Sequence, residues 1–336
     1  MNSTFIIAEL SANHNHNLQT AIDSIKAAAK IGVDAVKIQT YTADTLTIDC
    51  RKEDFVLKAG LWKGKSLYEL YQEAYTPWEW HEELFKVARE EGVIMFSTPF
   101  DNTAVDLLES LGNPIYKIAS FEVMDTELIR YAASKGKPMI ISTGVANENE
   151  IEEAIATCRE VGNDDITLLK CTSEYPAKIE DANLSMIPDM RMRFGVNVGL
   201  SDHSMGSLVP TVAVALGATV VEKHFILDRS IGGPDAAFSM DINEFRQLVT
   251  DIRLAEKSLG HVDYALSPSK ESARLRAGRS LYVVKDVKAG DVITRENVRC
   301  IRPGYGLHPR YFQQIIGRSF NKDKKVGDRV DSDDLF

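Results

Sequence analysis

The chain has 336 residues, of which 44% are hydrophobic and 26% charged, and its 39 Lys and Arg against 49 Asp and Glu give a formal net charge of −10. These proportions are ordinary for a folded globular protein and argue against disordered, collagen-like and coiled-coil chains. The negative charge also argues against general nucleic-acid binding, in which neutralisation of phosphates supplies most of the affinity, although a local cluster of Lys and Arg can still bind a small phosphorylated substrate.

Eight short apolar segments, rich in β-branched residues, alternate with stretches of helical pattern. The expected strands cover, in chain order, residues 5–10, 35–40, 94–99, 115–120, 139–144, 166–171, 196–201 and 218–225. Nearly continuous apolar strands are typical of a parallel sheet that helices cover. Among the helices, apolar residues recur with helical spacing from Leu18 to Ala29. Helix starts are predicted at Thr76-Pro77-Trp78-Glu79 and at Asn147 with Glu150.

Eight strand–helix units in about 260 residues predict a (β/α)8 TIM barrel. The count alone also permits a doubly wound sheet, but no Gly-x-Gly-x-x-Gly or Walker-type loop points to a nucleotide-binding fold. The interval between the second and third strands is much longer than the others, which indicates an insertion over about 41–75. A last helix is expected over about 241–259.

The pattern of apolar and polar residues changes after the last predicted helix. We expect a catalytic barrel over 1–260, a polar linker over 261–278, and a small, mostly β domain over 279–336, where short alternating segments are punctuated by glycines. A domain of fewer than about 60 residues is marginally stable alone. It is therefore expected to pack on the barrel or on a second copy of the chain.

The sequence further predicts a cytoplasmic protein without a membrane partner. The longest apolar run, 209–221, is interrupted by Thr211, Gly217 and Thr219 and is shorter than the ~20 residues of a membrane-spanning helix. The first residues lack the cationic segment and apolar core of a secretory leader. The four cysteines are too widely spaced for a disulfide framework or a paired metal site.

Polar and charged residues crowd the ends of all eight predicted strands. In a barrel these ends share one face, where the active sites of such barrels lie. A single residue of this kind could be satisfied by its neighbours, but a full ring of buried polar groups is costly unless it is used. The residues that we single out are Glu9, Lys37, Gln39, Thr98, Lys117, Ser120, Glu122, Ser142, Ser173, Tyr175, Ser201, His203 and His224.

His203 and His224 end the last two predicted strands, which are neighbours in a closed barrel. Two adjacent imidazoles can hold a divalent metal and leave positions free for water and substrate. No thiolates or carboxylates cluster with them, which argues against a closed structural zinc site. The alternative is that each histidine is structural.

Lys37 and Lys117 end two other strands beside several Ser and Thr hydroxyls. Such a ring suits a dianion, because each charge-assisted hydrogen bond contributes about 1.5–3 kcal/mol. Two alternatives stay open: the lysines are ion-pair partners of Glu9 and Glu122, or one of them is the Schiff-base nucleophile of a class I aldolase.

Two loops hold further candidates. Asp235 follows the last strand in Gly232-Gly233-Pro234-Asp235 and could bind sugar hydroxyls. Arg302, in a tight loop of the small domain, could bind hydroxyl or amide groups across an interface. The non-functional alternatives are that Asp235 lies in a flexible turn and that Arg302 is a solvated surface arginine.

Several long motifs, in the same order along the chain, resemble those of the sialic acid synthase family. They are AELSANHN, DAVKIQTYTADTLT, YKIASFE, ISTG, CTSEYP, GLSDH, EKHF, GGPD and RPGYG. The resemblance covers nearly the whole chain and includes a C-terminal module similar to type III antifreeze proteins, the β-clip or SAF fold. Within the family, the segments YTADTLT, AYTPWEWH, SFE and RPGYGLHP look most like the pseudaminic acid synthases.

The resemblance implies condensation of phosphoenolpyruvate with an N-acylated amino sugar, giving a nine-carbon 2-keto acid and phosphate. The expected sugar is 2,4-diacetamido-2,4,6-trideoxy-L-altrose, and the alternative is a manno-configured sugar that gives N-acetylneuraminate or legionaminate. The family implies a divalent metal, commonly Mn²⁺ with Mg²⁺ or Co²⁺ as alternatives, on His203 and His224. It implies a domain-swapped homodimer in which Arg302 reaches the sugar of the partner subunit.

The family also implies a role for each remaining residue. Glu9 would lie near the reacting carbons and position or deprotonate water. The sugar would contact Gln39, Glu122, Tyr175 and Asp235. Phosphoenolpyruvate would be held by Lys37, Thr98, Lys117, Ser120, Ser142, Ser173 and Ser201.

The sequence departs from the sialate pattern around its first strand. Leu10-Ser11-Ala12 precedes Asn13, where Ile/Ala-Gly-Val is common, and His16 replaces the usual glycine. These departures bear on which sugar is used more than on the reaction. A non-catalytic alternative is a sugar- or ice-binding protein whose barrel is a scaffold.

Overall fold

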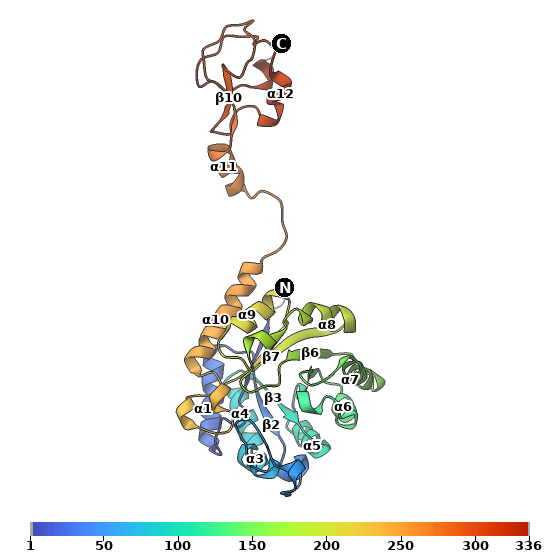
Figure 1. Ribbon diagram of the computed structural model, residues 1–336. Coiled ribbons are helices and arrows are strands. Elements are labelled where there is room, and N and C mark those ends of the chain that lie inside the picture. The colour runs from blue at the N-terminus through green and yellow to red at the C-terminus, as the bar shows by residue number, and fades with distance from the viewer. Residues whose placement is uncertain (1–2, 335–336) are drawn as a thin grey trace. The chain divides into compact units, whose positions relative to one another are not determined.

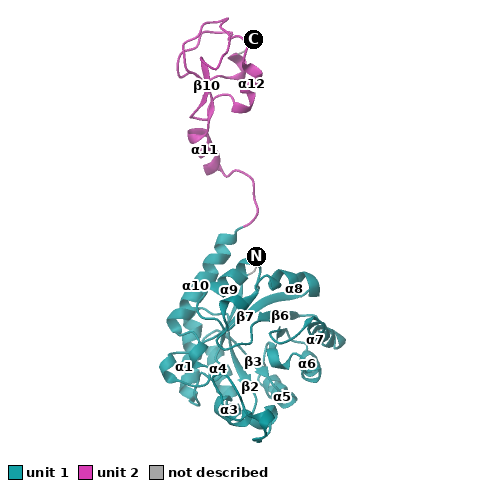
Figure 2. Cartoon of the chain, in the orientation of Figure 1, with its two compact units in different colours: residues 1–260 teal, residues 261–336 magenta. Residues whose placement is uncertain are grey.

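A computed structural model describes residues 3–334, so the outermost two residues at each end of the predicted domain ranges lie outside the described part. The chain forms two compact units, residues 1–260 and 261–336 (Figure 1 and Figure 2). Among the described residues, no helix is both long and apolar enough to cross a membrane. All four cysteines are free thiols.

The first unit is a closed barrel of eight parallel strands in sequential order, in which the last strand pairs with the first. The predicted (β/α)8 barrel is confirmed, and each predicted strand overlaps an observed one. The strands are β1 (Phe5–Glu9), β2 (Ala35–Thr40), β3 (Ile94–Pro99), β4 (Tyr116–Ile118), β5 (Met139–Ser142), β6 (Ile166–Cys171), β7 (Asn197–Asp202) and β8 (Val220–His224).

Helices surround the barrel, and most bury an apolar face in its core, whereas α2 and α3 in the insertion contribute no residue to that core (Figure 1). In α1, for example, Ala21, Ile25 and Ala28 are buried, Asn17 caps the first turn and Gly32 ends the helix in the left-handed region, where a glycine has no Cβ penalty. The helices of this unit are α1 (Leu18–Ile31), α2 (Ala43–Leu46), α3 (Leu67–Ala74), α4 (His81–Glu90), α5 (Asn102–Ser110), α6 (Thr126–Ala133), α7 (Glu148–Glu160), α8 (Met186–Phe194), α9 (Leu208–Ala215) and α10 (Ile242–Leu259).

Of the two predicted helix starts, one is confirmed and one is wrong. Asn147 and Glu150 form the capping box that begins α7. The Thr76–Glu79 segment forms no such box: a 3-10 turn covers Trp78–Trp80 without a side-chain cap, and α4 begins only at His81. The Thr76 hydroxyl instead lies 3.2 Å from the ring nitrogen Nε2 of His14.

The interior of the barrel is apolar at one level and polar at the next. Ile7, Ala35, Phe96, Ile140, Leu169 and Val220 form a separate buried cluster, one residue from each of six strands. Side chains two positions apart on a strand share a face. The next inward residues on these strands are therefore Glu9, Lys37, Thr98, Ser142, Cys171 and Glu222. The strand pattern thus builds a polar cup on an apolar floor.

The second unit has its own small core. A two-stranded antiparallel sheet pairs β9 (Ser280–Val283) with β10 (Val298–Ile301), and a short helix α12 spans Phe312–Ile315. The buried core is Leu281, Val283, Val287, Ile293, Val298, Ile315, Phe320 and Val330. The predicted linker contains a helix that the sequence pattern did not indicate, α11 (Pro268–Ala277), which Ser267 caps and Pro268 begins.

Candidate active site

Two lysines and two glutamates meet in the cup. Lys37 forms an ion pair with Glu9, its register neighbour across β1 and β2. Glu222 lies between the two ammonium groups, 3.8 Å from Lys37 Nζ and 3.6 Å from Lys117 Nζ. All four side chains are at most 7% exposed. The ion-pair alternative from the sequence is thus correct for Lys37 and Glu9, but the second carboxylate is Glu222 rather than Glu122.

The two central carboxyl groups differ in proton affinity. Burial raises the pKa of Glu9 to about 7, with Lys37 opposing the rise and Glu222 adding to it. Burial acts in the same direction on Glu222, but Lys117 and Lys37 outweigh it and lower the pKa of that carboxyl. Near neutral pH, Glu222 therefore stays ionised while Glu9 is able to take up or release a proton, a division of roles typical of acid–base sites.

Burial and the neighbouring carboxylates shift the pKa values of the two lysines in opposite directions. Burial lowers the pKa of Lys117, and Glu222 only partly opposes it. Lys37 is subject to the same desolvation, but Glu222 and Glu9 overcome it and raise the pKa of Lys37. Lys37 also donates a hydrogen bond of 3.1 Å to Thr98 Oγ1.

Hydroxyl groups and one backbone amide form a cradle beside the lysines. Ser120 lies in the 3-10 turn after β4 and accepts a hydrogen bond of 3.2 Å from the amide of Gly144. Ser173 Oγ lies 3.6 Å from Cys171 Sγ, and Ser142 is buried at the end of β5. A Cβ on Gly144 would clash with Ser173 Oγ and lie 3.0 Å from Ser120 Oγ. A side chain at this position would therefore displace Ser173 and crowd Ser120.

The two predicted histidines lie side by side. The ring centroids of His203 and His224 are 5.3 Å apart. Tyr175 packs on one side of them, with its ring centroid 4.4 Å from that of His203 and 6.4 Å from that of His224, and Phe238 packs 5.0 Å from His224. The two rings therefore lie together at the carboxyl ends of β7 and β8.

The nitrogen atoms of this pair fit a metal ion. His203 Nδ1 lies 2.9 Å from the carbonyl of Thr172, which as its acceptor leaves Nε2 free. His224 Nδ1 is buried with no hydrogen-bond partner among residues 3–334. Burial, then the positive charge of His203 and Lys37, lowers the pKa of His224 well below its usual value, so this ring is neutral, as a metal ligand must be. Burial also lowers the pKa of His203, but Cys171 outweighs burial and raises it, so a metal ion would displace a proton from that ring. In the described part of the chain, no group of three or more His, Cys, Asp or Glu side chains is placed so that it could hold a metal ion.

Asp235, Gln39 and Glu122 lie at the rim of the cup. Asp235 Oδ2 lies 3.9 Å from His224 Nδ1 and accepts a hydrogen bond from the backbone of Ala12. Gln39 is paired in register with Thr98 at the end of β2. Burial raises the pKa of Glu122 to about 7, and Lys117 opposes that rise.

Several buried polar atoms of the cup have no hydrogen-bond partner among the described residues. Such atoms are rare in native proteins and call for a ligand, water or ion. Those in the cup are Glu9 Oε1, Glu122 Oε2, Ser142 Oγ, Glu222 Oε2 and His224 Nδ1. Because they come from four different elements (β1, the 3-10 turn after β4, β5 and β8), they indicate a polar ligand large enough to span the cup.

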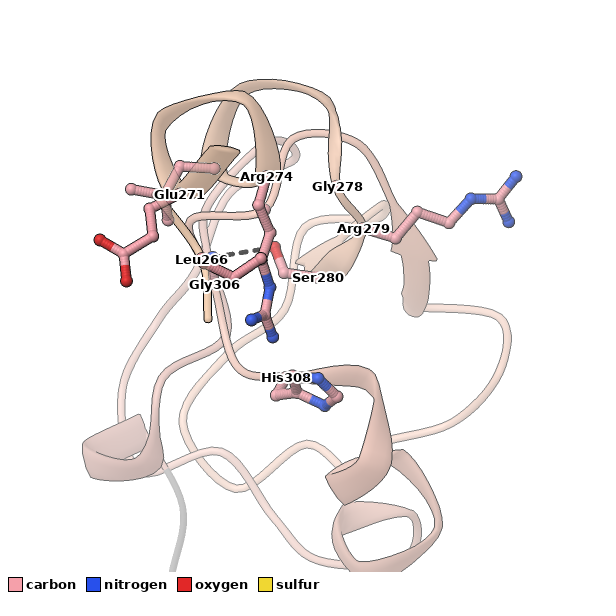
Figure 3. Close-up of a pocket in the computed structure, with 10 residues that line it drawn as sticks. Leu266, Glu271, Arg274, Gly278, Arg279, Ser280, Gly306 and His308 are labelled. Atoms are coloured by element: carbon pink, nitrogen blue, oxygen red, sulfur yellow. Dashed lines mark hydrogen bonds between the residues drawn. The ribbon is translucent and has the colours of Figure 1, made fainter. Parts of the chain in front are cut away.

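One predicted site residue is not in the cup. Arg302 lies in the second unit, directly after β10. That unit has a cavity of about 360 Å³ whose lining includes Arg274, Ser280 and His308, with Arg274 pointing towards His308 (Figure 3). Arg302 does not line this cavity, so the cavity adds nothing to the predicted site.

Sequence reasoning missed three residues of the cup. Glu222 belongs to the EKHF motif and lies two positions before His224, so strand alternation could have found it. Cys171 ends β6, and although burial raises the pKa of its thiol, contact with His203 lowers it to about 7. Gly144 follows β5, and no side chain drew attention to it.

Comparisons with known proteins agree with this geometry. The NeuB family matches residues 24–264, and the SAF domain matches residues 278–335, which confirms the predicted C-terminal fold. Over 331 residues the chain is 49% identical to a pseudaminic acid synthase of Campylobacter jejuni, covering 98% of this chain and 96% of that one. It is 47% identical to a pseudaminic acid synthase of Helicobacter pylori, covering 98% and 97%.

A solved relative has the same architecture. The crystal structure of N-acetylneuraminic acid synthetase from Leptospira borgpetersenii, in complex with citrate, is 31% identical to this chain with a TM-score of 0.72. The match covers 81% of this chain and 90% of that one.

Proposed function

The chain belongs to the NeuB family, and we propose that it condenses phosphoenolpyruvate with 2,4-diacetamido-2,4,6-trideoxy-L-altrose to give pseudaminic acid and inorganic phosphate. The observation that carries the proposal is the buried cup with two ammonium groups and unpartnered polar atoms. The identity of 47–49% to two pseudaminic acid synthases over nearly the whole chain selects the sugar.

Phosphoenolpyruvate fits the basic side of the cup. Its phosphate and carboxylate are anions, and Lys37, Lys117 and the hydroxyls of Ser120 and Ser142 are donors that can bind them. Charge-assisted hydrogen bonds of this kind contribute about 1.5–3 kcal/mol each. Before the anion binds, Glu9 and Glu222 compensate the charges of the two buried lysines.

The carboxylates support the chemistry that follows. Carbon 3 of phosphoenolpyruvate attacks the sugar aldehyde with the electron pair of its double bond, and positive charge develops at carbon 2. Glu222, which stays ionised, stabilises that charge. Water adds at carbon 2 and loses its proton to a carboxylate such as Glu9, whose pKa is about 7. The former aldehyde oxygen takes up a proton and becomes a hydroxyl. The bond from carbon 2 to the bridging oxygen then breaks, the hydroxyl that came from water loses its remaining proton to give the keto group, and phosphate leaves with the bridging oxygen.

A divalent ion belongs to this proposal, with Mn²⁺ as the first candidate and Mg²⁺ or Co²⁺ as alternatives. His203 and His224 would hold it. When bound, such an ion polarises a carbonyl oxygen and makes the aldehyde more electrophilic. In this arrangement the sugar would contact four residues at the rim of the cup, namely Tyr175, Gln39, Glu122 and Asp235.

The charges of the two units support a domain-swapped homodimer. Residues 261–336 hold 15 Lys and Arg against 10 Asp and Glu, a net charge of +5, whereas residues 1–260 hold 24 against 39, a net charge of −15. Opposite charges favour association of a C-terminal unit with a barrel. In the proposed dimer, Arg302 would reach the sugar of the partner's barrel. The four free thiols agree with a cytoplasmic location.

Phosphate release tests the function and the metal together. We expect purified protein to release phosphate from phosphoenolpyruvate with the diacetamido altrose, faster than with N-acetylmannosamine or the manno-configured diacetamido sugar. EDTA should abolish release and Mn²⁺ should restore it, because two imidazoles cannot replace a Lewis acid at the aldehyde. Release that persists unchanged in EDTA would refute the metal, and preference for a manno sugar would refute the assigned substrate.

A Schiff-base aldolase is the second candidate, because burial lowers the pKa of Lys117 and a neutral lysine is the nucleophile of that class. Borohydride would then trap a pyruvate adduct on Lys117, detectable by mass. The condensation proposed above forms no such adduct.

Gly144→Ala should raise the KM for phosphoenolpyruvate by about 30-fold. Its methyl group would occupy the space between Ser173 and Ser120 and remove about 2 kcal/mol of anion binding, the contribution of one charge-assisted hydrogen bond. Steady-state kinetics with each substrate varied in turn measure this. The KM for the sugar should change less than threefold, and an equal rise in both would contradict an anion cradle at Gly144.

A further inference from the structure

The insertion between β2 and β3 forms a hairpin-like excursion over residues 56–66. Val56 and Ser66 form an antiparallel bridge, and the amide of Leu57 donates a hydrogen bond of 2.9 Å to the carbonyl of Lys65. The turn at the tip contains Trp62, which belongs to none of the predicted strands.

Trp62 reaches from this excursion to the rim of the cup. Its indole N–H donates a hydrogen bond of 3.2 Å to the carbonyl of Pro234, the residue before Asp235. Its ring centroid lies 6.2 Å from that of Tyr175, which itself packs on His203. The indole is therefore one aromatic ring away from the histidine pair.

A cavity of about 530 Å³ lies at this position. Trp62 and Pro234 give it an apolar surface, and Asn15, Lys65 and Glu73 give it polar groups. Asn15 donates its Nδ2 to the carbonyl of Ile231 at 3.1 Å, which leaves its Oδ1 as an acceptor. Lys65 forms an ion pair with Glu73.

These groups match a neutral acylamino substituent better than an anion. An N-acyl group has an apolar methyl, one carbonyl acceptor and one N–H donor. The indole and Pro234 suit the methyl, an ammonium hydrogen of Lys65 suits the carbonyl, and Asn15 Oδ1 suits the N–H. This cavity offers a single ammonium group, that of Lys65, paired with Glu73, whereas the cup offers two for an anion.

Resting on the proposed function, we propose that this cavity is the subsite for the acylamino group at carbon 4 of the sugar and that Trp62 is the residue that selects for it. The aldehyde reacts beside His203 and His224, so carbon 4, three bonds further along the open chain, lies towards Tyr175 and Trp62. Sugars without an acylamino group at that carbon leave the subsite unused.

The test compares two sugars that differ only at carbon 4. They are 2,4-diacetamido-2,4,6-trideoxy-L-altrose and 2-acetamido-2,6-dideoxy-L-altrose, which carries a hydroxyl there. In Trp62→Ala, the ratio of kcat/KM for the first sugar over the second should fall about tenfold, because the apolar surface that buries the acyl methyl is lost. Lys65→Met, which keeps the stem and removes the donor, should lower the ratio about fivefold.

Trp78→Ala is the matched control, because the Trp78 indole also donates to a backbone carbonyl, that of Tyr41 at 3.1 Å, but does not line the cavity. Its ratio should equal that of the wild type. An unchanged ratio in Trp62→Ala would overturn the inference.

Failure of the proposed function looks different from failure of the subsite. In that case wild-type protein would release no phosphate with either sugar. Calorimetric titration of the diacetamido sugar into wild type and Trp62→Ala then decides the subsite alone. At least tenfold weaker binding to the variant would support it, and equal binding would overturn it.

Discussion

Replacing Lys117 by methionine should lower kcat/KM for phosphoenolpyruvate by about a thousandfold. Lys117 is 2% exposed, and its nearest carboxylate is Glu222 at 3.6 Å. Two charge-assisted hydrogen bonds to the bound anion are lost, together about 4 kcal/mol, and each 1.4 kcal/mol is a factor of ten. Methionine fills the space of the aliphatic stem, and Glu222 keeps Lys37 as a partner. The fold should therefore persist, and steady-state kinetics with phosphoenolpyruvate as the varied substrate measure the loss.

Lys170→Met is the control for removing a buried lysine from the barrel. Lys170 is also buried, but it donates to the carbonyl of Cys171 at 2.9 Å and to Thr172 Oγ1 at 3.3 Å, away from Glu222. We expect its kcat/KM to stay within about fivefold of the wild type, since only ordinary hydrogen bonds are lost. A Lys117→Met enzyme within tenfold of the wild type would remove Lys117 from the anion site.

Breaking the Asp202–Lys223 pair should destabilise the barrel by about 3–5 kcal/mol, because it leaves an unpaired charge in the interior. The two residues are register neighbours on β7 and β8. Lys223 contacts the carboxylate of Asp202 and the carbonyl of Ser204, and Asp202 accepts a hydrogen bond of 2.9 Å from the Ser204 amide. The pair is 1% and 5% exposed. Asp202→Leu and Lys223→Met should each show the loss.

Urea unfolding followed by tryptophan fluorescence measures this, because all three tryptophans lie in the barrel at positions 62, 78 and 80. The double variant should recover most of the stability, as replacing both partners of a buried pair is often neutral. Losses that simply add in the double variant would show that the two side chains act independently.

Sequence reasoning identified His203 and His224 as site residues, but it did not identify Glu222 or Lys223, which precede His224 on β8. His203 and His224 follow strands that are plain in the apolar pattern, so their shared location follows from the barrel alone. Whether Glu222 or Lys223 faces the interior depends on the phase of β8. The apolar start Val220-Val221 does not reveal that phase, but an inward-facing His224 does, because Glu222 lies two positions earlier on the same face of the strand.

Other misses arise where contacts distant in sequence decide the structure. Thr76 resembles a helix cap, yet its hydroxyl contacts His14, 62 positions away in the sequence. The helix α11 has no apolar stripe and no buried residue, so periodicity could not reveal it. The excursion of residues 56–66 was recognisable as part of an insertion, but no local pattern states that its tip contacts the loop after β8.

That excursion has a consequence for how relatives of this protein could have diverged. The reacting groups project from strands whose geometry the whole barrel determines, and any change there disturbs many neighbours. The tip near Trp62 belongs to a surface loop, and surface loops tolerate changes in sequence readily. Descendants of one ancestral enzyme could therefore acquire new sugar preferences through a few exchanges in that loop, while the inherited carbon–carbon bond formation stays intact.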